Sequence, residues 1–241
     1  MFRKVLALLV LAMLLSASMA LAQGTNPRLE IRPFLGFRAG GNVNESSYDY
    51  DDIADPLIED LNVKPSAQFG ISIGVPVALL GAYDPDNHIH LEAFWSTQSS
   101  TLRLDDGGVL GDPTLFNPDF ERDGDYIDLF DLSVHYIHFG GLYQWTGGDW
   151  NPYMNFSMGA TVFSPDDADV DSKSKFSMAL GGGVKRFFTE RLAGRIQLRG
   201  FATFLGSNDE LWCDYYGRCW VYESSVTFTQ FEISTGLTFA F

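Results

Sequence analysis

The stretch QFEISTGLTFAF, residues 230–241, alternates apolar side chains with polar or small ones along its whole length. A period of two places every second side chain on the same face of an extended chain. The last twelve residues therefore predict a strand with one apolar face. That face holds Phe231, Ile233, Thr235, Leu237, Phe239 and Phe241.

Seven more segments upstream show the same alternation, although the phase of 132–143 stays open because both parities contain apolar residues. In that segment Gly140 and Gly141 suggest a bulge. Segments of about ten alternating residues are typical of transmembrane β-barrels, whose bacterial members have even strand numbers from eight upward. The sequence predicts an all-β, eight-stranded, antiparallel up-and-down transmembrane barrel. The other seven predicted strands are 29–39, 67–77, 89–99, 132–143, 154–162, 176–184 and 192–204.

The gaps between these segments alternate in length. Outer-membrane barrels have short periplasmic turns and longer extracellular loops, so the long gaps predict the outward side and both chain ends the periplasmic side. The long gaps are roughly 40–65, 100–131, 164–174 and 206–229, and the short ones roughly 78–87, 145–152 and 189–191.

The N-terminus predicts export. Arg3 and Lys4 precede an apolar run from Val5 to Leu15, and small residues follow up to Ala22. This order is that of a cleaved signal peptide, so we expect a signal peptide over 1–22 and one barrel domain over 23–241. The sequence has 16 Lys and Arg against 31 Asp and Glu, a net charge of −15, which excludes binding to nucleic acid through bulk charge. The predicted location is the bacterial outer membrane.

Charged residues recur on the parity opposite the apolar one. On a lipid-facing surface each would cost about 2–4 kcal/mol near the bilayer midplane, so we expect these side chains to point into the lumen. An eight-stranded lumen is just wide enough for side chains to fill, and confined charges need partners. The sequence thus predicts a largely plugged polar lumen with a paired network. Its members are Arg28, Glu30, Arg32, Arg38, His90, Glu92, Lys185, Arg195, Arg199 and Glu232.

These features resemble the small outer-membrane β-barrel family that includes the transmembrane domain of outer membrane protein A and the opacity-type surface proteins. The signal, the eight segments and the terminal GLTFAF carry the resemblance. It implies that Phe239 and Phe241 form the signal that the barrel-assembly machinery recognises, and that outer-membrane lipid and lipopolysaccharide surround the barrel. No peptidoglycan-binding domain follows Phe241, so we expect no cell-wall tether.

Cys213 and Cys219 lie in the last long gap, within WCDYYGRCW. Because the exported compartment is oxidising, they predict a disulfide that rigidifies a surface loop; redox catalysis would favour a C-x-x-C spacing. The acidic residues concentrate in the long gaps, and we interpret them as solvated loops. Asp167, Asp169 and Asp171 have the spacing of a calcium loop, but Ser172 stands where that loop needs glycine. We predict no metal site and no cofactor.

We expect a non-enzymatic structural or surface-interaction protein whose acidic loops contact an extracellular ligand that the sequence does not identify. One alternative is a narrow channel for small hydrophilic solutes, gated by lumen pairs of Glu92 or Glu232 with Arg195 or Arg199.

Two further alternatives concern other classes of barrel. The first is a barrel resembling the lipid A deacylases, with Ser133 as nucleophile and His135 as base, oriented by Glu92 or Asp131. That family has the His before the Ser, and this sequence reverses the order. The second is a soluble lipocalin-like binder, which would turn its apolar face inward.

Overall fold

The computed structural model describes residues 29–44, 60–76, 87–105, 121–123, 126–145, 148–166, 172–206 and 227–241. The predicted signal peptide, Arg28, Cys213 and Cys219 lie outside these ranges. No helix in the described part of the chain is long and apolar enough to cross a membrane. The strands are β1 (Glu30–Asn44), β2 (Asp60–Val63), β3 (Ser66–Pro76), β4 (Asn87–Asp105), β5 (Glu121–Asp123), β6 (Tyr126–Trp145), β7 (Trp150–Pro165), β8 (Lys173–Phe187), β9 (Leu192–Phe204) and β10 (Thr227–Ala240).

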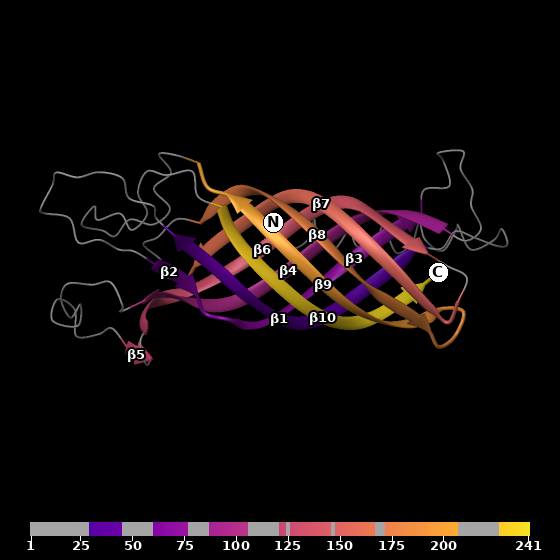
Figure 1. The fold of residues 1–241 in the computed structure, drawn as a ribbon, viewed down its shortest axis with the longest axis horizontal. Coiled ribbons are helices and arrows are strands. Elements are labelled where there is room, and N and C mark those ends of the chain that lie inside the picture. Colours follow the sequence, from indigo (N-terminus) through magenta and orange to yellow (C-terminus); the bar gives the residue numbers. More distant parts are fainter. Residues whose placement is uncertain are drawn as a thin grey trace, which may run out of the picture.

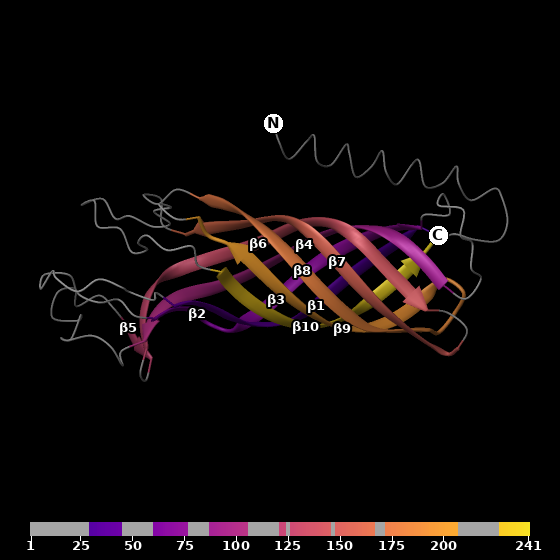
Figure 2. The same ribbon diagram turned by 45° about the horizontal axis from the view of Figure 1, so that its top comes forward.

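Eight of these strands close into an antiparallel barrel, as predicted (Figures 1 and 2). Around the wall the order is β1, β3, β4, β6, β7, β8, β9 and β10. The closing seam joins β1 to β10 antiparallel, from Glu30 opposite Ala240 to Asn42 opposite Thr229. Closure removes the free edges that half-apolar strands would otherwise expose.

Two short strands extend this barrel. β2 continues the path of β3 and pairs with both β1 and β4, whereas β5 pairs with β6 outside the ring. Both lie at one end of the barrel, and Phe241 lies at the opposite end (Figure 1). We call the end with β2 and β5 the loop end, because the longest connecting segments join strands there, and the opposite end the turn end.

The observed β4 and β6 are much longer than predicted, at 19 and 20 residues. At the loop end their outward positions are polar, as at Ser99 and Ser133, so backbone pairing continues beyond the apolar alternation. The predicted bulge at Gly140 and Gly141 is wrong, because the register there is continuous.

The irregularities of the barrel lie elsewhere. The register shifts between Gly40 and Asn42 in β1 and between Leu102 and Arg103 in β4. Gly40 and Gly41 have φ angles of 92° and 100°, a backbone region that side chains with a Cβ rarely adopt. Glycines at this point of β1 therefore permit the bulge.

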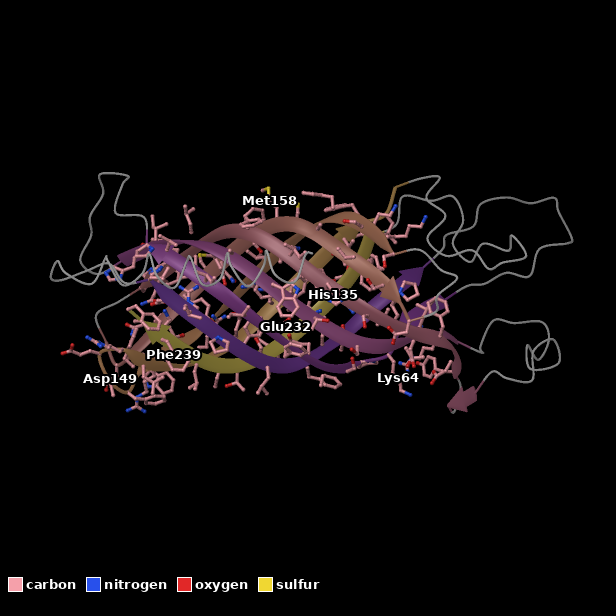
Figure 3. All side chains as sticks on the ribbon, turned by 180° about the vertical axis from the view of Figure 1, so that it is seen from behind. Lys64, His135, Asp149, Met158, Glu232 and Phe239 are labelled. Atoms are coloured by element: carbon pink, nitrogen blue, oxygen red, sulfur yellow. The ribbon has the colours of Figure 1, made fainter. Side chains whose placement is uncertain are left out.

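The outer surface of the barrel is apolar over its middle (Figure 3). Phe231 is 67% exposed and Leu198 63% exposed, and Met158 stands on the outside while Glu232 lies inside. A soluble lipocalin-like barrel would have the opposite polarity, so that alternative is wrong.

Aromatic side chains gather toward both ends of this apolar surface. Near the turn end, the rings of Tyr143 and Trp145 lie 4.8 Å apart. Toward the loop end, the Phe176 and Phe204 rings stack at 5.9 Å. Rings at these two levels are typical of the aromatic girdles that flank the hydrocarbon region of a membrane barrel.

Candidate functional site

The lumen gathers the charged side chains that alternate with the apolar surface residues. Nine of the ten predicted lumen residues fall in the described ranges, and all nine are buried inside the barrel. Strand parity explains this, because successive side chains of a strand point to opposite faces and each of the nine lies directly between outward-facing residues. The nine are Glu30, Arg32, Arg38, His90, Glu92, Lys185, Arg195, Arg199 and Glu232.

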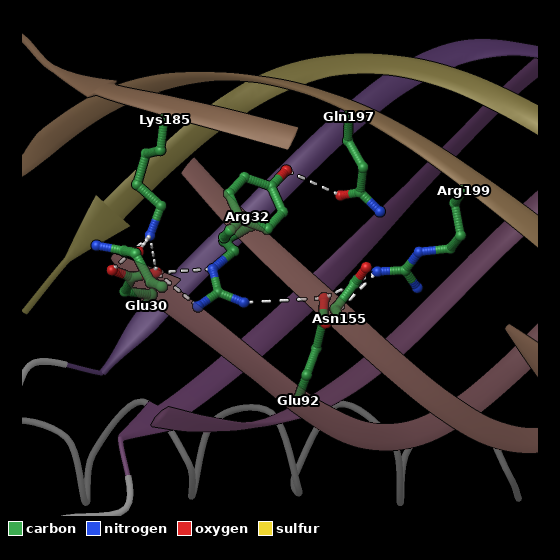
Figure 4. A network of polar contacts seen from close by, with 9 residues as sticks. Glu30, Arg32, Glu92, Asn155, Lys185, Gln197 and Arg199 are labelled. Atoms are coloured by element: carbon green, nitrogen blue, oxygen red, sulfur yellow. Dashed lines mark hydrogen bonds and ion pairs between the residues drawn. The ribbon is translucent and has the colours of Figure 1, made fainter. Parts of the chain in front are cut away.

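Near the turn end, Glu30 binds two cations from different strands (Figure 4). Arg32 Nε donates to Glu30 Oε2 at 2.7 Å, and Lys185 Nζ donates to both carboxylate oxygens at 2.9 and 2.7 Å. Lys185 also donates to Gln144 Oε1 at 2.6 Å. Since Lys185 belongs to β8 and Glu30 to β1, this group ties strands together across the lumen.

Glu92 forms the next level of the network. Its carboxylate accepts from Arg199 Nη2 at 3.3 Å and from Asn155 Nδ2 at 3.1 Å, and it lies 3.8 Å from Arg32 Nη1. The Arg32 guanidinium lies over Gly74, where a Cβ would overlap it. A glycine at this position therefore leaves the space that Arg32 occupies.

Arg195 differs from the other lumen cations. Among the described residues no carboxylate pairs with its guanidinium, which lies instead over the rings of Tyr153, at 5.4 Å, and Phe34, at 5.9 Å. The side chain is nevertheless buried. Sequence reasoning placed Arg195 in a paired network, and the structure brings it into the lumen without a carboxylate partner.

Closer to the loop end, Arg38 and Glu232 form a second ion pair at 2.6 Å, and Arg38 Nη2 also donates to Ser96 Oγ. The Arg38 guanidinium lies 4.7 Å from the centre of the Tyr136 ring and 4.9 Å from that of Phe201. Sequence reasoning missed these rings, although Phe201 has the same parity as Arg199. Parity alone would have placed Phe201 in the lumen, but not Tyr136, because the phase of the segment 132–143 is ambiguous.

Beyond Arg38 the lumen becomes less polar. Tyr136 Oη donates to Gln230 Oε1 at 2.9 Å, and Gln230 Nε2 donates to Gln98 Oε1 at 3.3 Å, so this relay crosses from β6 through β10 to β4. An apolar layer follows, in which the Phe163 and Phe228 rings meet edge to face at 5.3 Å. The loop-end layer consists of Val63, Leu102, Leu132, Val134, Phe163 and Phe228, all at most 2% exposed. The predicted polar lumen is thus polar only in part.

The sequence profile of the outer membrane protein beta-barrel domain family matches residues 7–239. The chain belongs to this family. Its location is therefore the bacterial outer membrane, and the apolar outer surface fits a barrel surrounded by lipid. No curated protein matches the chain.

Several solved outer-membrane barrels are similar at low identity. The N-terminal β-barrel domain of Pseudomonas aeruginosa OprF is 14% identical, with 91% of this chain and 100% of that chain covered and a TM-score of 0.43. Neisserial surface protein A is 11% identical, with 88% and 97% covered and a TM-score of 0.46. The outer membrane protease OmpT from Escherichia coli is 9% identical, with 90% and 98% covered and a TM-score of 0.45.

The geometry of this outer-membrane barrel does not assemble the deacylase-like site. Ser133 and His135 lie on the outward parity of β6, between the inward Leu132, Val134 and Tyr136. Glu92 is inside the barrel, so the wall separates it from His135. Asp131 instead accepts from Thr101 Oγ1 at 3.0 Å.

The structure also bears on the predictions about metal binding, the C-terminal phenylalanines, the acidic gaps and the two cysteines. Within the described ranges, no group of three or more His, Cys, Asp or Glu side chains is arranged to hold a metal ion. Phe239 and Phe241 stand on the outer surface at the turn end, and the Phe241 N–H donates to the Leu29 carbonyl at 2.9 Å. Most residues of the acidic gaps, like the two cysteines, lie outside the described residues.

Proposed function

We propose that this outer-membrane barrel is a non-enzymatic surface protein whose closed lumen fixes the scaffold and whose connecting segments contact the outside of the cell. We assign the loop end to the cell exterior and the turn end to the periplasm. The support for this orientation is the distribution of connection lengths, since outer-membrane barrels keep their short turns in the periplasm.

The loop-end layer is the observation that carries the proposal. Phe163, Phe228 and their aliphatic neighbours come from different strands and are almost fully buried. An apolar layer with interior-like packing leaves no polar path for an ion at that level. Below it, the ion pairs of Glu30, Glu92 and Glu232 fill the lumen further.

Single-channel recording in a planar bilayer tests closure. We expect the wild-type barrel to be silent and a Phe163→Ala, Phe228→Ala double variant to conduct, because truncating both rings opens a gap in the layer. The matched control truncates two outward rings of comparable size, Phe176→Ala with Phe204→Ala, and should stay silent. Regular conductance steps from the wild type would overturn the proposal.

The second candidate is the narrow channel, and buried polar groups favour it. Among the described residues, the side-chain nitrogens of His90, the amide of Gln68 and the hydroxyl of Ser72 have no hydrogen-bond partner. Buried polar groups of this kind are commonly satisfied by water. If the wild type conducts, Arg199→Glu should change the conductance, because it reverses the charge beside Glu92.

The proposed partners follow from the outer surface. Outer-membrane lipid and lipopolysaccharide cover the apolar surface, and the barrel-assembly machinery recognises Phe239 and Phe241 at the turn end.

The disulfide between Cys213 and Cys219 rigidifies the last connecting segment. Non-reducing mass spectrometry of a tryptic digest would detect that disulfide directly.

A further inference from the structure

The charges in the lumen do not balance, and the imbalance is local. Arg38 is paired with Glu232 toward the loop end. The cluster below it contains four cations and two carboxylates, all buried. This cluster consists of Arg32, Lys185, Arg195, Arg199, Glu30 and Glu92.

Within this cluster the excess positive charge falls on Arg195. Glu30 is shared by Arg32 and Lys185, and Glu92 is bound by Arg199 and approached by Arg32. Arg195 is 4% exposed, and no described residue forms an ion pair with its guanidinium. Glu92 acts on Arg195 only from beyond ion-pair distance and is already bound by Arg199. A buried charge without a close counter-charge is strongly unfavourable, so the site calls for an anion.

Hydrogen-bond donors line the wall next to Arg195. Arg195, Gln197 and Arg199 are successive inward residues of β9. Gln197 Oε1 accepts from Tyr153 Oη at 3.2 Å, while its Nε2 has no partner among the described residues. Arg199 likewise has Nε and Nη1 without described partners. Two side chains that are nine-tenths buried or more thus offer unused N–H groups on the same strand as Arg195.

The surroundings of Arg195 restrict the size of any ligand. The rings of Tyr153 and Phe34 flank the guanidinium. Tyr153 and Phe34 also occupy the space above two glycines of the adjacent strands, because a Cβ on Gly183 would lie 2.7 Å from Tyr153 Oη and one on Gly236 would lie 2.8 Å from Phe34 Cβ. A monatomic ion suits this space better than a phosphate or a sugar acid.

We propose that the lumen holds a small inorganic anion, of the chloride class, beside Arg195, with Gln197 Nε2 and the free N–H groups of Arg199 as further donors. The anion neutralises part of the excess positive charge and fixes the Arg195 side chain between its two rings. The proposal goes beyond closure of the lumen, because an anion can bind there whether or not the barrel conducts.

The first test uses thermal unfolding of the refolded chain in detergent, followed by far-UV circular dichroism. Sodium chloride and sodium gluconate are compared at equal ionic strength, so that general screening is matched. We expect chloride to raise the unfolding midpoint saturably, by about 2–4 °C, because a ligand that binds only the folded state stabilises it.

Two variants test whether the chloride-dependent rise of the unfolding midpoint depends on Arg195. Arg195→Gln should lose the chloride dependence and be at least as stable as the wild type in gluconate, because it removes the buried unpaired charge. Arg186→Gln, which alters an exposed arginine at the turn end, should keep the wild-type shift. Equal wild-type midpoints in the two salts, or an unchanged shift in Arg195→Gln, would overturn the proposal.

Wild-type crystals grown in bromide decide the question if Arg195→Gln does not fold. Anomalous scattering should show one bromide within hydrogen-bond distance of the Arg195 guanidinium. A lumen that holds only water there would contradict the proposal. These measurements do not involve conductance. A conducting barrel would therefore refute closure of the lumen but would not contradict the anion site.

Discussion

Arg38 and Glu232 face each other directly across the seam that closes the barrel, with Nη2 and Oε2 2.6 Å apart and both side chains fully buried. In the β-sheet Glu232 has Arg38 on one side and Arg199 on the other. Yet Arg199 turns to Glu92, a residue of β4, and leaves Glu232 to Arg38. The closing seam therefore has a dedicated ion pair.

Glu232→Gln should destabilise the barrel by about 3–5 kcal/mol, because it leaves the Arg38 charge buried without its partner. Urea unfolding in lipid vesicles, followed by tryptophan fluorescence, would measure the loss. An Arg38→Met, Glu232→Leu double variant should recover much of the stability, because both charges are gone. A loss below about 1 kcal/mol in Glu232→Gln would mean that Arg38 finds another counter-charge.

Gly74→Ala should destabilise the barrel by about 1–3 kcal/mol, because the added methyl group overlaps the Arg32 guanidinium and displaces it from Glu30. The matched control is Gly141→Ala, where the nearest atom lies 3.9 Å from the new Cβ. We expect that control to change the free energy of unfolding by about 0.5 kcal/mol or less. Equal urea midpoints for the two variants would contradict the packing of Arg32 over Gly74.

Leu198→Arg should cost about 2–4 kcal/mol, because it places a charge at the middle of the lipid-facing surface. Phe188→Arg changes a residue of equal exposure in the turn after β8, where we expect a cost of about 0–1 kcal/mol. Unfolding from vesicles measures both variants. Similar costs at the two positions would mean that the bilayer covers the barrel differently.

Deletion of Phe241 should lower the amount of assembled barrel in the outer membrane of cells severalfold, because the assembly machinery loses part of its proposed signal. In the refolded protein the deletion removes one backbone hydrogen bond to Leu29, so its stability should fall by only about 1 kcal/mol. Heat-modifiable mobility on gels reports assembly, and Phe188→Ser controls for the loss of an exposed ring at the same end. Normal assembly without Phe241 would remove the proposed role.

The sequence predicts a barrel strand well where its two faces differ along its whole length. In β10 the outward Phe231 and Ile233 alternate with the inward Gln230, Glu232 and Ser234, as expected. The β6 pattern is ambiguous for a physical reason. At the loop end its inward residues are apolar, such as Leu132 and Val134, while the outward Ser133 and His135 are polar, so the usual contrast is reversed.

The pairing of charges could not be predicted in the same way. Parity places Arg195 and Arg199 in the lumen, but the choice of Glu92 by Arg199 depends on a contact between β4 and β9, which are not neighbours in the wall. The inward aromatic rings decide where each guanidinium lies, as the 3.8 Å approach of Arg199 to the Phe94 ring illustrates. Such contacts arise from register and closure, which a single strand does not encode.

The loop-end layer closes the lumen at one end, so that the lumen can open only toward the turn end. With the proposed orientation, water and small ions that reach the buried charges enter from the periplasm. The electrolyte around Arg195 then follows the composition of the periplasm, even though the protein sits at the cell surface. A change in external salt acts on this barrel only after it has crossed the membrane by another route.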